Sequence, residues 1–235
     1  MSIKRSSKPE YTVHLPVTNK RVKFSPFNMR SERTLMMATQ SQDQDELANA
    51  VINTLNDHIS TPDVKAEDLP QAEAELLLLN MRSKSVGEKI ELVVNDPEDE
   101  NKTYNAKVDL TKITVTVPKG YSDSIQLDED TLITFKLPGL TTMEGLKVDE
   151  DDFNSTMSII SRCIKALNVG EECYLPGDTP LSDFEDFLLD LDTGTFQKIT
   201  DQFFTKMPVL SATVTTKRPD GTSFKTEVVG LQNFL

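Results

Sequence analysis

The sequence predicts an α+β protein, because helical and strand-like patterns occupy separate stretches of the chain. Helical spacing of apolar residues dominates before residue 87, and polar and apolar residues alternate over much of 88–137. Short helices then precede a final hairpin. Strands do not alternate regularly with helices, which excludes a doubly wound sheet. The expected organisation is a flexible basic arm over 1–19 and one domain over 20–235, with two lobes divided near 140–150 as the alternative.

The first elements follow from alternation and capping. The segment 21–24 alternates polar and apolar residues, as a strand does, and a helix is expected over about 31–40. Asp43 followed by Glu46 is a capping-box-like start for a second helix. This helix ends near His58, where a cation suits the helix dipole.

The most buried helix is expected over 71–84. Pro70 suits its first turn, Gly87 suits its end, and it contains the only sustained aliphatic run of the chain, Leu76 to Leu79. A strand over 88–94 and a polar turn should follow it.

The second half combines strands and short helices. Residues 108–117 alternate with one slip between Leu110 and Ile113, which predicts a bulged strand, and a further strand lies within 125–137. A helix is expected over 153–167, and its inward residues are Met157, Ile160, Ile164 and Leu167.

The last elements surround a strong turn signal. Short helices are expected over about 181–191 and 194–205. A hairpin should join 209–216 to 223–229 across the turn residues Pro219, Asp220 and Gly221.

Charge is distributed unevenly along the chain. The net charge is −13, yet residues 1–30 hold seven basic side chains and one acidic, so the remainder carries −19. Such an acidic chain is not expected to bind nucleic acid, because proteins that bind nucleic acid carry a broad basic face. The basic arm is expected to dock on an acidic partner or on the acidic body of this protein, with a solvated tail as the alternative.

The composition also restricts the cellular compartment in which the protein is expected. Two cysteines exclude a disulfide-rich secreted scaffold, and no apolar segment follows the first residues as a secretory signal would. The run from Leu76 to Leu79 is too short to span a membrane. We expect a soluble protein without membrane contact, in a reducing compartment or a particle assembled there.

No pattern in the sequence indicates catalysis. No glycine-rich phosphate loop is present, neither histidine lies in a metal-binding pattern, and Cys163 falls beside the buried stripe of a predicted helix. Acidic runs such as 128–130 are interpreted as solvated faces. We therefore expect no catalytic, cofactor-binding or metal-binding residue, and no enzyme.

Two apolar clusters lie within the predicted domain, one just after the basic arm and one near the carboxyl end. Aromatic and methionine side chains are enriched at protein interfaces, but they also build ordinary cores. Both interpretations stay open for each residue. The candidate partner contacts are Phe24, Phe27, Met29, Phe203, Phe204 and Phe234.

Four segments in order also carry a resemblance to a known family. Residues 21–27 (RVKFSPF) and the helix after them resemble the opening of the T-even-type bacteriophage baseplate hub proteins. Residues 78–88 (LLNMRSKSVGE), 203–210 (FFTKMPVL) and 230–235 (GLQNFL) are similar to that family's later signatures. The resemblance covers about residues 20–235.

The chain departs from this family at its hairpin tips. Some members place Cys-x-x-Cys pairs there, as in a zinc ribbon, whereas residues 95–101 and 217–221 contain no cysteine. The resemblance therefore implies no metal role for this chain, and the first hairpin is expected to be held by its strands alone.

The resemblance implies a non-enzymatic tail protein of the central baseplate hub. It would be a structural subunit or act in hub assembly, with other hub or tail proteins as partners, in a virion assembled in the host cytoplasm. A tail-assembly chaperone released before completion is the alternative, and a small acidic hydrolase a remote one. Homo-oligomerisation and the identity of the partner stay open.

Overall fold

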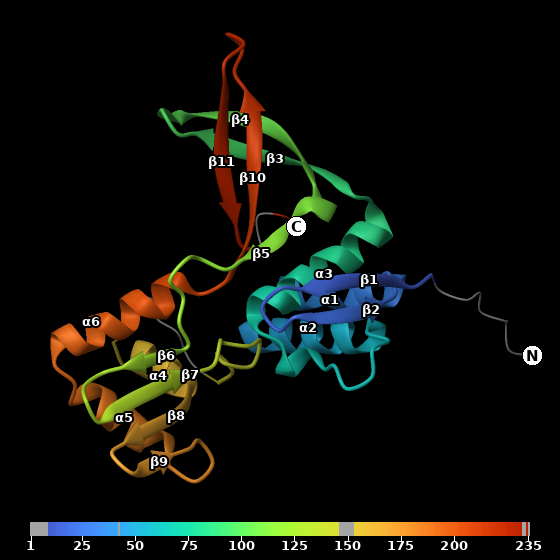
Figure 1. The fold of residues 1–235 in the computed structure, drawn as a ribbon. Coiled ribbons are helices and arrows are strands. Elements are labelled where there is room, and N and C mark those ends of the chain that lie inside the picture. Colours follow the sequence, from blue (N-terminus) through green and yellow to red (C-terminus); the bar gives the residue numbers. More distant parts are fainter. Residues whose placement is uncertain (1–8, 42, 146–152, 232–233, 235) are drawn as a thin grey trace, which may run out of the picture. The chain divides into compact units, whose positions relative to one another are not determined.

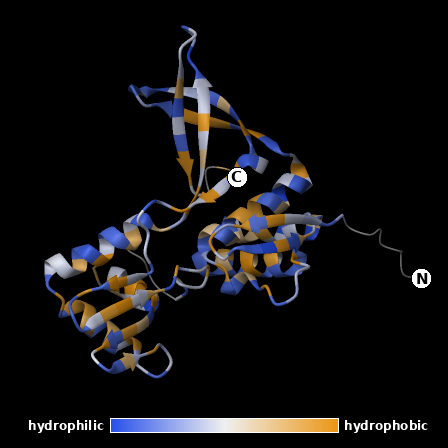
Figure 2. Ribbon diagram, in the orientation of Figure 1, coloured by the Kyte–Doolittle hydropathy of each residue, from blue (hydrophilic) through white to orange (hydrophobic). Residues whose placement is uncertain are grey.

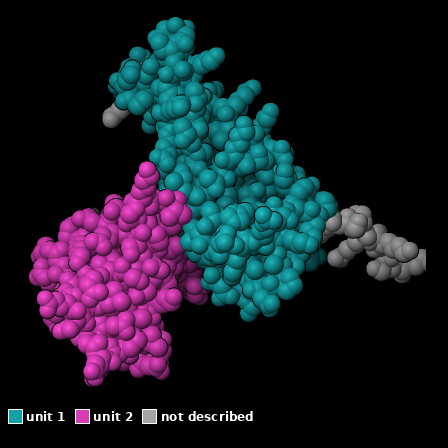
Figure 3. All heavy atoms as spheres, in the orientation of Figure 1, with its two compact units in different colours: residues 1–116, 209–235 teal, residues 117–208 magenta. Residues whose placement is uncertain are grey.

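The protein is an α+β structure built of two compact units. This computed structural model describes residues 9–41, 43–145, 153–231 and 234 (Figure 1). Unit 1 comprises Met1–Thr116 and Val209–Leu235, and unit 2 comprises Val117–Pro208 (Figure 3). The division therefore lies beside residues 116 and 208 and not near 140–150, because the last segment of the chain folds with the first.

The first part of unit 1 is a small hairpin packed with three helices (Figure 1). The strand β1 pairs with β2 in antiparallel register. Residues 9–19, which the sequence assigned to a flexible arm, thus contain a strand that buries Leu15, and only residues 1–8 of the arm lie outside the described residues. The elements are β1 (Tyr11–Leu15), β2 (Lys20–Phe24), α1 (Met29–Ser41), α2 (Gln44–His58), the 3₁₀ turn η1 (Ala66–Asp68) and α3 (Gln71–Val86).

The predicted cap and the predicted buried helix are both present. Asp43 Oδ1 accepts hydrogen bonds from the backbone N–H groups of Asp45 and Glu46 at 2.9 and 3.0 Å, which satisfies two donors at the start of α2. Helix α3 ends at Val86 and is capped by Gly87, whose φ of 144° favours glycine. It buries the whole run Leu76–Leu79 and forms the centre of unit 1.

Two hairpins complete unit 1. The strands β3 (Lys89–Asp96) and β4 (Asp99–Asp109) pair antiparallel, and so do β10 (Val209–Lys217) and β11 (Ser223–Val229). The two hairpins pack against each other, and both hydrophobic and hydrophilic residues occur along their strands (Figure 2). The apolar side chains meet between them, as the 5.7 Å separation of the Tyr104 and Phe224 rings shows.

The predicted strand over 108–117 is wrong as a single element. β4 ends at Asp109, a 3₁₀ turn η2 (Leu110–Lys112) follows, and β5 (Thr114–Thr116) pairs with β10 instead of β3. Asp109 Oδ1 accepts from the backbone N–H and the hydroxyl of Thr111 at 3.1 and 2.6 Å, which stabilises the turn. The slip in alternation marks a transfer between sheets and not a bulge.

Unit 2 is a four-stranded antiparallel sheet with helices (Figure 1). The strand order is β6-β7-β8-β9, so β6 and β9 are its edges. No helix in the described part of the chain has the length and apolar character needed to cross a membrane. The elements are β6 (Ser124–Gln126), β7 (Thr131–Phe135), α4 (Phe153–Arg162), β8 (Ile164–Val169), β9 (Glu172–Tyr174), α5 (Leu181–Leu189), α6 (Thr193–Gln202) and the 3₁₀ turn η3 (Phe204–Lys206).

The helix predicted over 153–167 is also corrected. It ends at Arg162, because the chain then pairs with β7: the backbone N–H of Lys136 donates to the carbonyl of Cys163 at 2.7 Å. Ile164 and Leu167 reach the core from a strand, since β8 pairs antiparallel with β7. The four residues expected to face inward are all buried.

Candidate interaction surfaces

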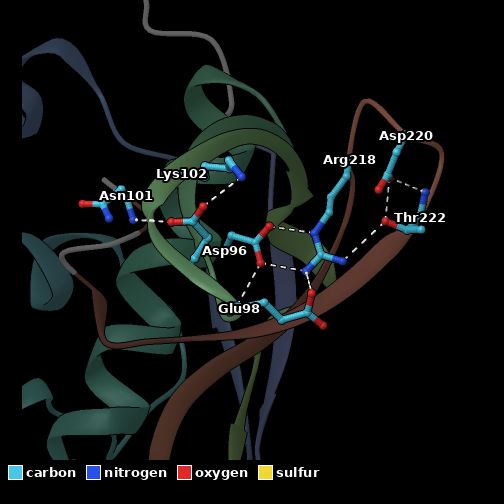
Figure 4. Close-up of polar contacts among 8 residues, drawn as sticks. Asp96, Glu98, Asn101, Lys102, Arg218, Asp220 and Thr222 are labelled. Atoms are coloured by element: carbon cyan, nitrogen blue, oxygen red, sulfur yellow. Dashed lines mark hydrogen bonds and ion pairs between the residues drawn. The ribbon is translucent and has the colours of Figure 1, made fainter.

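The tips of the two hairpins of unit 1 are joined by a charged cluster, which we call the clasp: Asp96, Glu98 and Arg218 (Figure 4). Arg218 donates two hydrogen bonds to Asp96, from Nε to Oδ2 at 2.6 Å and from Nη2 to Oδ1 at 2.7 Å. Arg218 Nη2 also lies 3.0 Å from Glu98 Oε2. This paired, two-pronged geometry is the strong form of a carboxylate–guanidinium contact.

Turn residues on both hairpins support the clasp. The Arg218 guanidinium lies 4.9 Å from the centroid of the Phe224 ring, which gives the cation an aromatic face. Asp220 accepts from the backbone N–H of Thr222 at 2.9 Å, which shapes the turn after Arg218. On the other hairpin, Lys102 Nζ lies 2.8 Å from Asp99 Oδ2.

The electrostatics of the clasp follow from these contacts. The hydrogen bonds from Arg218 hold the pKa of Asp96 at about 2, below its ordinary 3.8, against the opposing effect of desolvation. The same pair raises the pKa of Arg218. Only 3% of the Asp96 side chain is exposed, so an ionised carboxylate is retained there because its partner is fixed.

The first hairpin is therefore not held by its strands alone, and that expectation is wrong. Arg218 is 122 residues from Asp96 in the sequence and links the two tips directly. Among the described residues, no group of three or more histidine, cysteine, aspartate or glutamate side chains is placed to hold a metal ion. Cys163 is buried, as expected, and burial raises the pKa of its thiol to about 11.

The structure separates the six candidate partner contacts into two groups. Phe24, Phe203 and Phe234 are buried, so in this conformation they serve the core of their own unit. Phe203 stacks on Phe135 with ring centroids 4.8 Å apart and contacts Phe204 edge-on at 4.8 Å. The core interpretation, which the sequence left open, describes these three phenylalanines.

The other three candidates retain exposed surface to different extents. Phe27 is half-buried, with its ring 5.7 Å from the imidazole of His58, and Phe204 is half-buried in the aromatic cluster of unit 2. Met29, at the start of α1, is 78% exposed. Met29 is thus the candidate that the fold leaves most accessible.

Helix α1 presents further methionines that the sequence prediction did not select. Met36 and Met37 are each 58% exposed, and they lie seven and eight residues after Met29, on the same side of the helix. We call Met29, Met36 and Met37 the methionine face. The spacing was visible in the sequence, but the sequence alone did not show which side of the helix is covered.

Basic side chains accompany the methionine face. Arg33 lies one turn from each of the three methionines by its spacing, and Arg30 is exposed on the same helix. Neither guanidinium forms an ion pair within the described residues, and Glu32 is the only acidic residue of α1. The face is therefore apolar and basic in an otherwise acidic chain.

Polar contacts attach α1 to the rest of unit 1. Ser31 is the one residue of the helix that is buried, and its hydroxyl lies 2.8 Å from His58 Nε2. Ser25 Oγ lies 3.0 Å from His58 Nδ1. His58 lies in the last turn of α2, as predicted. Through Ser25 and Ser31 it links the segment before α1 and α1 itself to α2.

Comparison with known proteins gives one result for nearly the whole chain. The sequence profile of the family described as T4 bacteriophage base plate protein matches residues 8–235. No curated protein matches the chain, and no solved structure does.

Proposed function

The chain belongs to the T4 bacteriophage base plate protein family, and on that premise we propose that it acts in the central hub of the baseplate. Membership makes it a phage tail protein whose partners are other tail or baseplate proteins. The finer assignment rests on the hub-protein signatures at residues 21–27, 78–88, 203–210 and 230–235. The proposed role is non-enzymatic, as a structural subunit or in hub assembly.

The methionine face of α1 carries the proposal that the chain docks on a neighbouring protein. Methionine side chains adapt to a partner surface, and burial of exposed apolar area is the main favourable contribution to association. Arg30 and Arg33 border the face, so the partner is a hub protein whose surface is apolar and acidic. Helix α1 buries a single residue in its own unit, and its outer side is therefore available for that contact.

Mass spectrometry tests the hub assignment. Peptides of this chain in purified virions, at a fixed ratio to other hub proteins, support a structural subunit. Their presence in isolated hub intermediates but not in virions supports an assembly role, including the chaperone alternative. Absence from both preparations contradicts the proposal.

A variant pair tests the docking surface. The double substitution Met36→Ser and Met37→Ser should reduce incorporation into reconstituted hub complexes while leaving the chain folded, because both side chains are solvent-exposed. Val93→Ser is the matched control, since Val93 is 68% exposed on β3 and outside the methionine face. Equal incorporation of the double variant and the control would place the contact elsewhere.

A further inference from the structure

Unit 2 contains an apolar pocket between the strands β8 and β9 and the helix α5 (Figure 1). The pocket has a volume of about 270 Å³ and opens to solvent. This is below the range of about 300–1,000 Å³ typical of small-molecule sites, so it suits an inserted side chain better than a whole small molecule. The strands contribute Leu167, Val169 and Tyr174 to its lining, and α5 contributes Asp183, Phe184 and Phe187.

The pocket is an uncovered end of the core of unit 2. Leu167 and Phe184, which line it, are both buried members of that core. Tyr174 is the cross-strand partner of Leu167, and Val169 follows Leu167 by two positions, so all three side chains lie on one face of the sheet. The core therefore continues into an apolar surface, on which four side chains have more than a third of their area accessible: Val169, Tyr174, Leu175 and Leu181.

The strand β9 offers a backbone edge beside this surface. It pairs with β8 on one side only, so within the described structure its other side has no strand partner. An extended segment added there would pair with the backbone of β9 and place alternate side chains on the pocket face. On that face the segment would meet Tyr174, at the pocket, and two positions away Glu172. A strand added to β9 thus encounters an apolar and then an acidic neighbour.

Charge defines the kind of segment that fits. Residues 165–192, which include β9 and α5, hold eight acidic side chains and the single basic residue Lys165. Among the described residues, none of these eight carboxylates forms an ion pair with a lysine or an arginine. The complementary partner is therefore basic. A second copy of β9 is a poor partner for the same edge, because two acidic segments would meet.

We propose that β9 and the adjacent pocket bind an extended basic segment of another protein. The segment adds to the edge of β9, inserts one apolar side chain into the pocket beside Tyr174, and places a lysine or arginine two positions away, at Glu172. This site goes beyond the hub proposal and is separate from the methionine face. The methionine face is apolar and basic, whereas this site is apolar and acidic, so the two surfaces select partner segments of opposite charge.

Two synthetic peptides of equal composition and charge test the spacing. In the alternating peptide, Thr-Lys-Thr-Leu-Thr-Lys-Thr, both lysines share a face with the leucine when the peptide is extended. In the adjacent peptide, Thr-Thr-Lys-Leu-Lys-Thr-Thr, they point to the opposite face. The measurement is the change in amide NMR shifts of the full ¹⁵N-labelled chain during titration. The alternating peptide should bind severalfold more tightly and shift amides of β9 and α5. Equal binding of the two peptides, binding of neither, or shifts confined to other elements would overturn the proposal.

Matched substitutions separate the apolar and the charged parts of the contact. Threonine in place of the leucine of the alternating peptide should raise Kd at least about tenfold, because no apolar side chain then enters the pocket. Glu172→Lys in the chain should weaken binding of the alternating peptide severalfold, whereas Asp201→Lys, an equal charge change at an exposed position of α6 outside the pocket, should not. Equal weakening by the two charge changes would indicate general attraction to an acidic unit and contradict a contact at β9.

Discussion

Helices α3 and α1 of unit 1 show two different ways of holding a helix in a fold. α3 has 16 residues and buries eight, among them the run Leu76–Leu79 and Met81, whereas α1 has 13 residues and buries Ser31 alone. Apolar burial fixes α3, and hydrogen bonds around His58 attach α1. Helix α3 therefore stabilises unit 1 through its buried side chains, whereas α1 leaves most of its side chains accessible to solvent.

The largest effect is expected in α3. Leu79→Ala should lower the free energy of unfolding of the chain by about 2–5 kcal/mol, because Leu79 is fully buried and its loss leaves a cavity. Denaturant unfolding followed by circular dichroism measures this change. A loss below about 1 kcal/mol would mean that the site collapses without cost and that α3 is not the centre of the core.

The clasp is a second place where polar contacts hold elements of unit 1 together, here the tips of its two hairpins. Arg218→Met should destabilise the hairpin pair because it leaves the buried Asp96 carboxylate without its partner. Glu98→Gln is the control and should have a much smaller effect, since the Glu98 side chain is 79% exposed. Hydrogen exchange at the amides of β3 and β11 measures both variants, and equal protection in the two would show that packing alone holds the hairpins.

The clasp also predicts an acid dependence. The pKa of Asp96 is depressed to about 2, so its contribution to stability is complete above its ordinary value of 3.8 and is lost as the pH falls through about 2. Other carboxylates titrate in the same range, and therefore the informative quantity is the difference between the wild-type chain and Asp96→Asn. That difference should shrink between about pH 5 and pH 2. A constant difference would show that Asp96 is not ionised in the clasp.

A smaller effect is expected at the attachment of α1. Ser31→Ala removes the hydroxyl that lies 2.8 Å from His58 Nε2 and should cost about 0.5–1.5 kcal/mol, the usual net value of one hydrogen bond. The loss should be local, with faster hydrogen exchange in α1 and unchanged exchange in α3. Equal acceleration in both helices would show that α1 contributes to the core after all.

Sequence patterns predicted the elements that are determined locally. The cap at Asp43, the buried run in α3 and the hairpin formed by β10 and β11 are all present because their signals lie within a few residues. Residues 164–167 of β8 were predicted as the end of a helix, since Ile160, Ile164 and Leu167 have helical spacing and only pairing with β7 decides otherwise. Local periodicity cannot report a partner strand that is distant in the sequence.

The candidate surfaces were less predictable for the same physical reason. Asp96 and Arg218 are 122 residues apart, and no local pattern joins them. Phenylalanine and methionine both occur at interfaces and in cores. Here Phe24, Phe203 and Phe234 are buried, whereas Met36 and Met37 are exposed. Helical spacing states which residues share a side, and tertiary packing decides which side is covered.

Two methionines give the smallest and most discriminating prediction. Met37→Ser in α1 should change the free energy of unfolding by no more than about 0.5 kcal/mol, because Met37 is 58% exposed. Met81→Ser in α3 is the matched control: it makes the same substitution at a fully buried position and should cost several times more. The denaturant midpoints of the two variants measure this difference in stability, provided that their m-values are equal. If Met37→Ser were as costly as Met81→Ser, the outer side of α1 would be covered by the chain itself, and the methionine face would belong to the core and not to a partner.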